Sequence, residues 1–227
     1  MNFKTLQDRV IYTLGLQETI SLDERALTKQ YVNEGLIDII TRTRPYTRCI
    51  TLNLSANTPI HDMSNTIISL LDVEYPGYGF LRRLSREDAT LAQQGGLPGF
   101  AYEEPLFWIS PVPTTALAIN AYGIFRPDPL TGDTDDPQVE RWGGLAPEFH
   151  PAIVNYACWK AAEYTQHEQS AMGEKWRIAY EGKDGDTGDI SRIKKILSKR
   201  VTPQASRRRD LTGNLGQLGS ALDYIGG

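Results

Sequence analysis

The sequence is poor in the side chains from which most enzyme active sites are built. It contains two cysteines and three histidines among 227 residues. Cys49 and Cys158 lie in different segments and fit no CxxC spacing, so we expect both to be reduced and buried, with no disulfide or metal role. His61, His150 and His167 are widely spaced along the chain, so a catalytic triad would need the fold to assemble it by coincidence. We therefore predict no catalytic residue.

Long hydrophobic runs are also absent. No apolar run approaches the ~20 residues of a membrane span, and the first segment, MNFKTLQDRV, lacks the apolar core of a signal peptide. Hydrophobic residues make up 40% of the chain and charged residues 23%, as in an ordinary soluble globular protein. We expect a protein that is made and kept in a cytoplasm and has no membrane partner.

Motifs for nucleotide binding, nucleophilic catalysis and zinc binding are missing or incomplete. The sequence has no GxxxxGK[ST] and no GxSxG, and Gly77-Tyr78-Gly79 lacks the third glycine of a dinucleotide fingerprint. His167-Glu168 begins like HExxH, but Ala171 occupies the position of the second zinc ligand, so we interpret His167 as a surface residue. No metal and no cofactor are predicted. A metal-dependent hydrolase using His150, His167 and nearby acids is kept as an alternative that metal analysis would test.

Two groups of aspartates resemble cation sites without matching them. Asp184, Asp186 and Asp189 resemble the start of an EF-hand loop, but its sixth and twelfth positions are Asp189 and Lys195 in place of glycine and glutamate. We interpret residues 184–188 as a solvated hinge. A second group lies in a segment rich in Pro, Gly and Asp and is interpreted as turn residues that need no ion: Asp128, Asp133, Asp135 and Asp136.

Helical periodicity predicts two helices near the start of the chain. The first runs from about Thr5 to Leu14. The second begins at the capping box formed by Ser21 and Glu24 and ends at about Arg42, shortly before a proline. Gly35 in its middle costs about 1 kcal/mol relative to alanine, so we interpret it as a point where another helix crosses.

The longest periodic segment, from Glu148 to Gly182, is predicted to form a single helix around which the rest of the chain packs. Pro151 suits its first turn, and Gly182 is a suitable end. One face of this helix is apolar at intervals of three and four residues: Ile153, Tyr156, Ala157, Ala161, Tyr164, Met172, Trp176 and Tyr180.

After Pro45 the period changes to two residues, which is typical of β-strands. The segment RCITLNL, residues 48–54, alternates cleanly. We expect further strands at 66–73, 79–84, 106–109 and 117–125, and a short helix that begins at Ser85 and ends by Gly95-Gly96. A long ordered loop, residues 126–147, then returns the chain to the long helix.

These elements predict an α+β fold with a helical core, an inserted small antiparallel β domain and an extended C-terminal arm. The helical body is assigned to residues 1–45 and 148–200, and the β domain with its return loop to residues 46–147. The arm is assigned to residues 201–227. A short basic helix, Ile190 to Arg200 with Asp189 as its cap, ends the helical body.

Charge is divided unevenly along the chain. Residues 1–188 hold 16 Lys and Arg against 25 Asp and Glu, whereas residues 189–227 hold 8 against 3. The last 27 residues cannot bury enough surface to fold alone, so we expect disorder in the free chain. Their apolar side chains indicate a segment that a partner orders. The predicted contact residues are Lys199, Arg200, Arg207, Arg208, Arg209, Leu211, Leu215, Leu218, Leu222, Tyr224 and Ile225.

Two kinds of partner fit this basic segment. Residues 189–209 could bind nucleic acid by neutralising phosphates, with an affinity that falls steeply as salt rises. However, the segment has no interleaved aromatics for base stacking and no helix-turn-helix pattern. We favour an acidic protein surface, because the leucine-bearing residues that follow need an apolar groove.

The order of these segments resembles the head-to-tail connector, or adaptor, proteins of tailed bacteriophages. The resemblance is carried by ERALTKQYVNEGLIDIITRTRPY, the alternating RCITLNL that follows it, and FLRRLSREDA in the β insertion. RPDPLTGDTDDP in the return loop, EFHPAIVNYACWKAAEY in the long helix and the basic tail complete it. The likeness covers nearly the whole chain but contains no single diagnostic motif.

This resemblance implies a structural virion protein without enzyme activity. Such proteins assemble as a ring, usually twelvefold, beneath the portal, dock a C-terminal arm on the portal protein and offer a platform to tail or nozzle proteins. Double-stranded DNA would pass through the channel without specific binding, which an acidic body suits. The expected location is the head-tail junction of the virion, and the host cytoplasm during assembly. Subunit contacts would also explain the loop aromatics Tyr75, Tyr78 and Trp142.

Overall fold

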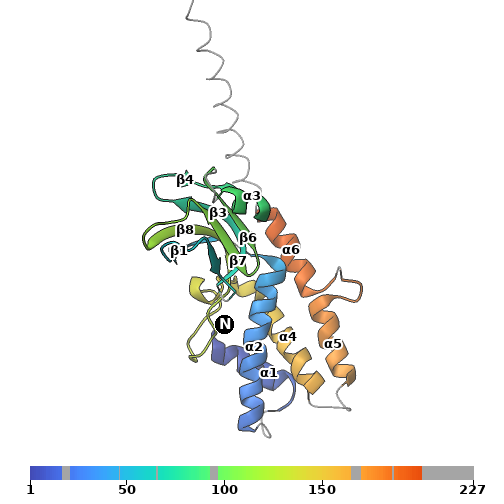
Figure 1. The fold of residues 1–227 in the computed structure, drawn as a ribbon. Coiled ribbons are helices and arrows are strands. Elements are labelled where there is room, and N and C mark those ends of the chain that lie inside the picture. Colours follow the sequence, from blue (N-terminus) through green and yellow to red (C-terminus); the bar gives the residue numbers. More distant parts are fainter. Residues whose placement is uncertain are drawn as a thin grey trace, which may run out of the picture.

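The computed structural model describes residues 1–16, 21–45, 47–64, 66–92, 97–164, 170–185 and 187–200. Within these ranges it contains six α-helices and two four-stranded sheets, so the predicted α+β class is confirmed. Five of the helices pack together, and the sheets lie at one end of this helical part (Figure 1). None of the helices in the described ranges is both long and apolar enough to cross a membrane.

The first helix begins two residues before the predicted start at Thr5, whereas the second begins at the predicted capping box. Helix α1 (Phe3–Thr13) begins after Asn2, whose side chain accepts a hydrogen bond from the Thr5 amide. Helix α2 (Leu22–Thr43) begins with the predicted capping box between Ser21 and Glu24. It ends at Arg44, which has a positive φ of 49°.

The prediction of one long helix from Glu148 to Gly182 was wrong. The segment forms α4 (His150–Tyr164) and α5 (Ser170–Glu181), which pack against each other (Figure 1). A Cβ atom built on Gly173 would lie 3.5 Å from the Ala162 Cβ, whereas 11 residues of one straight helix span about 16 Å. The sequence shows no break in its apolar period, because each of the two helices has an apolar face that packs on the core, with Ile153 and Ala157 in α4 and Tyr180 in α5.

The crossing point predicted at Gly35 is confirmed. A Cβ atom built there would lie 2.9 Å from Cδ1 of Tyr156 in α4. The missing side chain therefore lets α2 and α4 approach closely, and this approach outweighs the cost of glycine within a helix. Helix α6 (Asp189–Arg200) completes the helical part and buries Ile190 and Ile193.

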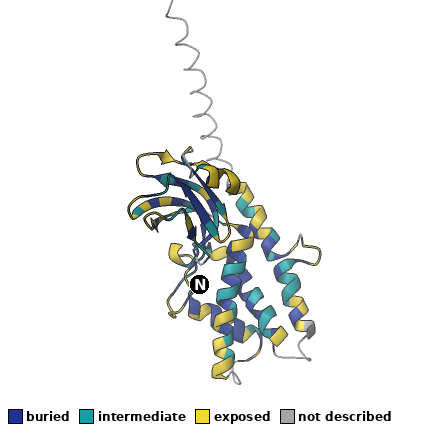
Figure 2. Ribbon diagram, in the orientation of Figure 1, coloured by how far each residue is buried: buried dark blue, intermediate teal, exposed yellow. Residues whose placement is uncertain are grey.

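A single hydrophobic core joins these five helices (Figure 2). It also includes residues of the last strand and of the return loop, which tie the two parts of the molecule together. The fully buried members contributed by α1, α2, α4, α5 and α6 include Phe3, Leu6, Val10, Val32, Leu36, Ile39, Ile153, Ala157, Tyr180 and Ile193.

The β part consists of two sheets that face each other. One sheet has the order β1 (Arg48–Leu54), β8 (Leu117–Phe125), β3 (Ile67–Tyr75) and β4 (Gly79–Phe80). The other has the order β2 (Ile60–Asp62), β7 (Leu106–Ser110), β6 (Gly99–Glu103) and β5 (Arg82–Arg83). All the strand pairs are antiparallel except β5 with β6. The prediction of a mainly antiparallel β domain is therefore confirmed.

Side chains from both sheets form one core between them. The even positions of β1 point inward and the odd positions point outward, so the alternation of RCITLNL is confirmed. Phe100, Phe107 and Ile109 of the second sheet meet Leu70 and Ile119 of the first. Outside the second sheet lies α3 (Arg86–Ala92), where the Arg86 guanidinium stacks 5.3 Å from the centre of the Trp108 ring.

Four details of the β part differ from the sequence predictions. Strands β2 and β6 were not predicted, because their short segments lack a clear alternation. The predicted strand 79–84 is two short strands that join different sheets. Cys49 is exposed, since it lies on the outward side of β1, while Cys158 is buried as expected. Tyr75 is buried at the end of β3, so it is not an exposed loop aromatic.

Candidate interaction surfaces

The histidines and cysteines form no catalytic or metal-binding group in the part of the chain that the structure describes. No set of three His, Cys, Asp or Glu side chains there could hold a metal ion. His61 and His150 are buried in different parts of the molecule. His167, which begins the incomplete HExxH pattern, lies outside the described residues.

His150 has a structural environment. Its Nδ1 lies 2.8 Å from the Met1 amino nitrogen, and its Nε2 lies 3.0 Å from the Leu145 carbonyl oxygen. Because an ammonium group only donates, Nδ1 must accept and Nε2–H must donate, which requires the neutral ring. Burial lowers the pKa of His150, and the Met1 ammonium acts in the same direction. Asp136, with an oxygen 4.0 Å from Nε2, acts in the opposite direction.

The return loop, defined here as residues 126–149, is held firmly against the helices. The Asn33 side chain of α2 accepts from the Leu130 amide at 2.7 Å and donates to the Leu130 carbonyl at 3.1 Å. The Phe3 and Lys4 amides of α1 donate to the carbonyls of Asp135 and Asp133, at 2.7 and 3.2 Å. An ordered loop was predicted here, but the role of Asn33 has no local sequence signal.

Asp135 organises the tip of the return loop. Its Oδ2 accepts hydrogen bonds of 2.8 Å from the amides of Thr131 and Gly132. These two bonds lower the pKa of the Asp135 carboxyl. Asp135 therefore acts as a turn residue, in the way that the sequence indicates for this segment.

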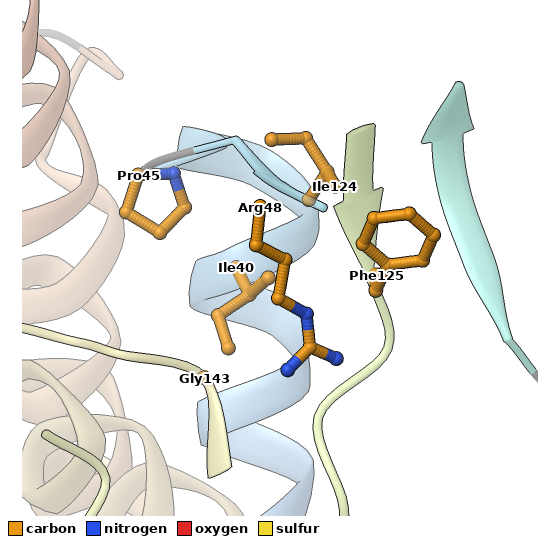
Figure 3. A pocket seen from close by; sticks show the side chains of 6 residues that line it. All are labelled: Ile40, Pro45, Arg48, Ile124, Phe125 and Gly143. Carbon is orange, nitrogen blue, oxygen red and sulfur yellow. The ribbon is translucent and has the colours of Figure 1, made fainter. Parts of the chain in front are cut away.

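Arg48 joins the return loop to the β part (Figure 3). Its guanidinium donates to the Glu140 carbonyl at 2.9 Å and to the Arg126 carbonyl at 3.4 Å. It also stacks 5.4 Å from the centre of the Phe125 ring. Beside it lies a cavity of about 10 Å³, lined by Ile40, Pro45, Arg48, Ile124, Phe125 and Gly143. That volume holds at most about one water molecule, so the junction is a structural contact without room for a ligand.

Helix α6 presents a basic face to solvent. Arg192, Lys194, Lys195 and Lys199 are exposed, whereas Ile190 and Ile193 face the core. Asp189 is the first helical residue. Its carboxylate accepts from the Asn155 amide group at 2.7 Å and lies 3.6 Å from the Arg192 guanidinium.

The connection between α5 and α6 is compact. Gly182 has a φ of +91°, and a Cβ atom built on Gly188 would lie 2.3 Å from backbone atoms of Glu181 and Gly182. Only glycine permits this approach of two backbone segments. This close backbone approach fixes the direction in which α6 leaves α5.

The predicted arm begins at the exposed end of α6. Lys199 is exposed and Arg200 is the last residue of the helix. The remaining predicted contact residues, Arg207 to Arg209 and the apolar series from Leu211 to Ile225, lie outside the described residues. In the described part of the predicted basic segment 189–209, the side chains of Arg192, Lys194, Lys195 and Lys199 therefore lie on the surface.

Exposed apolar side chains lie on the β part as well. Tyr78 and Phe80, near the β3–β4 turn, are each 55% exposed. A groove of about 420 Å³ runs beside α3 and contains the strongly exposed Leu91 and Leu97; it is lined by Arg82, Leu84, Asp88, Leu91, Ala92 and Leu97. Among these lining residues there is no acid, base and nucleophile in hydrogen-bonded order, so the groove suits protein contact better than catalysis.

Comparison with known proteins identifies the family of the chain. Residues 1–208 match the family described as SU10 adaptor protein, a range that includes every described element and the start of the predicted arm. No curated protein matches the chain. The predicted resemblance to head-to-tail adaptors is thereby confirmed. The chain belongs to the SU10 adaptor protein family, a family of phage head-to-tail adaptors, and is a structural phage protein.

Proposed function

We propose that this protein assembles as a ring, of twelve copies in the usual arrangement, beneath the portal of a phage head. Its C-terminal arm docks on the portal protein, and its body provides a platform for tail or nozzle proteins. Double-stranded DNA passes through the channel of the ring without specific binding. The family match places the chain among phage head-to-tail adaptors, and the ring, the arm and the platform are our extension of that assignment.

The observation that carries the proposal is the position of α6. This helix exposes Lys194, Lys195 and Lys199, and its last residue, Arg200, directly precedes the arm in the sequence. The helix ends at the side of the molecule that also carries α3 (Figure 1). A basic start followed by spaced leucines suits binding coupled to folding, in which electrostatic attraction guides encounter and apolar contacts hold the complex. The acidic remainder of the chain has the same sign of charge as DNA, which favours passage over adhesion.

Truncation tests the arm directly. A chain ending at Arg200 should keep its melting temperature within about 2 °C, because the three hydrophobic clusters of the described chain lie before that point. It should also lose binding to purified portal particles in co-sedimentation and electron microscopy. Deletion of Gly226 and Gly227 alone is the matched control and should leave binding intact. Normal assembly of the truncated chain on portals would overturn the role of the arm.

Charge reversal tests whether the arm binds the portal through its positive charge or only through the size of its side chains. Replacement of Arg207, Arg208 and Arg209 by Glu should weaken portal binding strongly at low salt, whereas replacement by Lys should retain most of it. Filter binding to DNA across salt concentrations tests the alternative reading of residues 189–209. A steep log-log slope together with absent portal binding would favour a nucleic-acid-binding protein.

A further inference from the structure

The return loop has the properties of a preformed binding surface. It contains 24 residues with only two short 3-10 turns, η1 (Glu140–Trp142) and η2 (Pro147–Phe149). Long loops without regular structure are uncommon in compact proteins unless they serve a function. The bonds from Asn33, Phe3 and Lys4 hold this loop in one conformation. Binding of a partner to this loop would therefore cost little conformational entropy, because the loop is already ordered.

The surface of this loop is acidic. Residues 126–149 contain six Asp and Glu against two Arg. Asp135 and Asp136 are engaged within the loop by backbone amides. Asp128 and Asp133 have exposed side chains, and so does Glu140. Backbone amides thus engage Asp135 and Asp136, whereas Asp128 and Asp133 are exposed to solvent.

Helix α6 carries the opposite charge. Residues 189–200 contain five Lys and Arg against one Asp, so their net charge matches that of the loop in size and opposes it in sign. Arg192, Lys195 and Lys199 are spaced three and four residues apart, which places them along one stripe of the helix. The ion pair of Arg192 with Asp189 is long, at 3.6 Å, and the Arg192 side chain is 56% exposed, so it does little to neutralise the stripe.

The two surfaces lie on opposite flanks of the subunit. In Figure 1 the return loop lies to the left of α2, whereas α6 lies to the right. One molecule therefore cannot join its own loop to its own basic stripe. Two different surfaces on opposite flanks are what a closed ring requires, because each subunit must offer one face to the copy ahead and another to the copy behind.

We infer that the basic stripe of α6, formed by Arg192, Lys195 and Lys199, contacts the return loop of the next copy at Asp128 and Asp133. This inference rests on the proposed ring and names the surfaces that close it. The contact is electrostatic and therefore weakens as salt increases. It also leaves the arm beyond Arg200 available for the portal.

Complementary charge-reversal variants of the full chain test this contact. The first variant, D128K/D133K, keeps the basic stripe, and the second, R192E/K195E, keeps the acidic loop. Alone, each presents like charges at every subunit boundary, so neither should form rings on portals at low salt. Mixed in equal amounts they should assemble again, because each boundary then pairs opposite charges. Rings formed by either variant alone, or no rings from the mixture, would overturn the inference.

Matched controls keep the charge change but move it elsewhere. The pair R25E/K29E alters two exposed residues of α2, and D23K/E87K alters exposed acids of α2 and α3. Both controls should assemble like the wild type. Circular dichroism of every variant checks folding, so that loss of assembly by an unfolded chain is recognised.

Zero-length carbodiimide cross-linking tests the contact without requiring stable rings. The reagent joins a lysine amine to a carboxylate in direct contact. In a mixture of ¹⁴N- and ¹⁵N-labelled wild-type chains with portal, cross-links between differently labelled chains should join Lys195 or Lys199 to Asp128 or Asp133. Absence of these cross-links from chains that do bind the portal would refute the inference and leave the proposed function intact. Their presence without portal binding would support the inference and count against the proposed function.

Discussion

The phenolic oxygen of Tyr180 in α5 donates a hydrogen bond of 2.5 Å to Oδ2 of Asp38 in α2, across 142 positions of sequence. One turn further along α2, Arg42 lies 3.2 Å from Glu181. These two contacts hold α5, which packs against α4, next to α2 as well. Burial raises the pKa of Tyr180, and the bond to Asp38 acts in the same direction, so the phenol stays protonated as the donor.

Replacement of Tyr180 by Phe should destabilise the protein by about 1 kcal/mol. The change removes the donor but leaves the ring in the core, and Asp38 keeps a second contact with Arg42 at 3.5 Å. Urea unfolding followed by circular dichroism measures the free energy. The control is Tyr12→Phe, which alters a side chain that is 73% exposed and should change stability by less than about 0.5 kcal/mol. Equal effects of the two substitutions would contradict the role assigned to this bond.

Gly35→Ala should destabilise the protein even though alanine favours helices. The helix propensity gain is about 1 kcal/mol, whereas overpacking a core contact costs about 1 to 3 kcal/mol. The new Cβ would lie 2.9 Å from Cδ1 and 3.2 Å from Cβ of Tyr156, so rotation of the ring alone cannot relieve the clash. Thermal unfolding measures the net effect.

Gly173→Ala provides the matched comparison for Gly35. Both glycines lie within helices, but the nearest atom to a Cβ at position 173 is the Ala162 Cβ at 3.5 Å, an ordinary contact. This substitution should therefore raise stability by up to about 1 kcal/mol. If both alanine variants changed the melting temperature in the same direction, close packing at Gly35 would not be the deciding factor.

Stability should fall as pH decreases below about 6.5 because of His150. Burial lowers the pKa of His150 in the folded state from its ordinary value of 6.5. Below that value the unfolded chain binds a proton that the folded chain excludes, so the free energy of unfolding decreases with decreasing pH and is level above it. Urea unfolding between pH 5 and 8 measures this slope.

Two variants test which histidine causes the pH dependence of stability. His150→Gln should reduce the pH dependence between about pH 5 and 6.5. His61→Gln should reduce it too, because burial also lowers the pKa of His61. A wild-type stability that stays constant over this range would show that neither ring is kept neutral by the fold.

The two thiols should react at very different rates. Cys49 lies exposed on β1, whereas Cys158 is buried in α4 and burial raises the pKa of its thiol to about 12. Thiolate is the reactive form, so a maleimide should label one site per native chain and two sites per unfolded chain. Cys49→Ser should abolish native labelling. Mass spectrometry of labelled peptides would contradict the structure if Cys158 were modified first.

Asn33→Ala should loosen the return loop. The substitution removes both side-chain hydrogen bonds to the backbone of Leu130 and leaves a partly buried amide and carbonyl unpaired, at a cost of about 1 to 3 kcal/mol. Hydrogen exchange should be faster at the Leu130 amide. Asn53→Ala, on the exposed side of β1, is the control and should leave the exchange of the loop unchanged. If the loop presents a preformed surface, Asn33→Ala should also weaken ring formation.

Structural features that are set by residues close together in the chain were predicted correctly from the amino-acid sequence. The capping box at Ser21 and Glu24, the alternation of residues 48–54 and the change of period after Pro45 each depend on neighbours within a few residues. Gly35 is a similar case, because an unfavourable residue within a strong helix indicates a close contact. Family membership followed from the order of such segments.

Other features depended on contacts between distant residues. A periodic pattern does not record whether a helix continues or folds back, so the break between α4 and α5 was missed. Near this break two residues predicted on the apolar face, Tyr164 and Met172, are 61% and 40% exposed. The exposed position of Cys49 depends on which side of β1 faces the second sheet. The sequence alone determined most of the helical and extended segments, the charge division and the absence of known catalytic motifs. Only the tertiary structure placed the acidic loop and basic helix on opposite flanks, because that placement follows from packing between segments far apart in the chain.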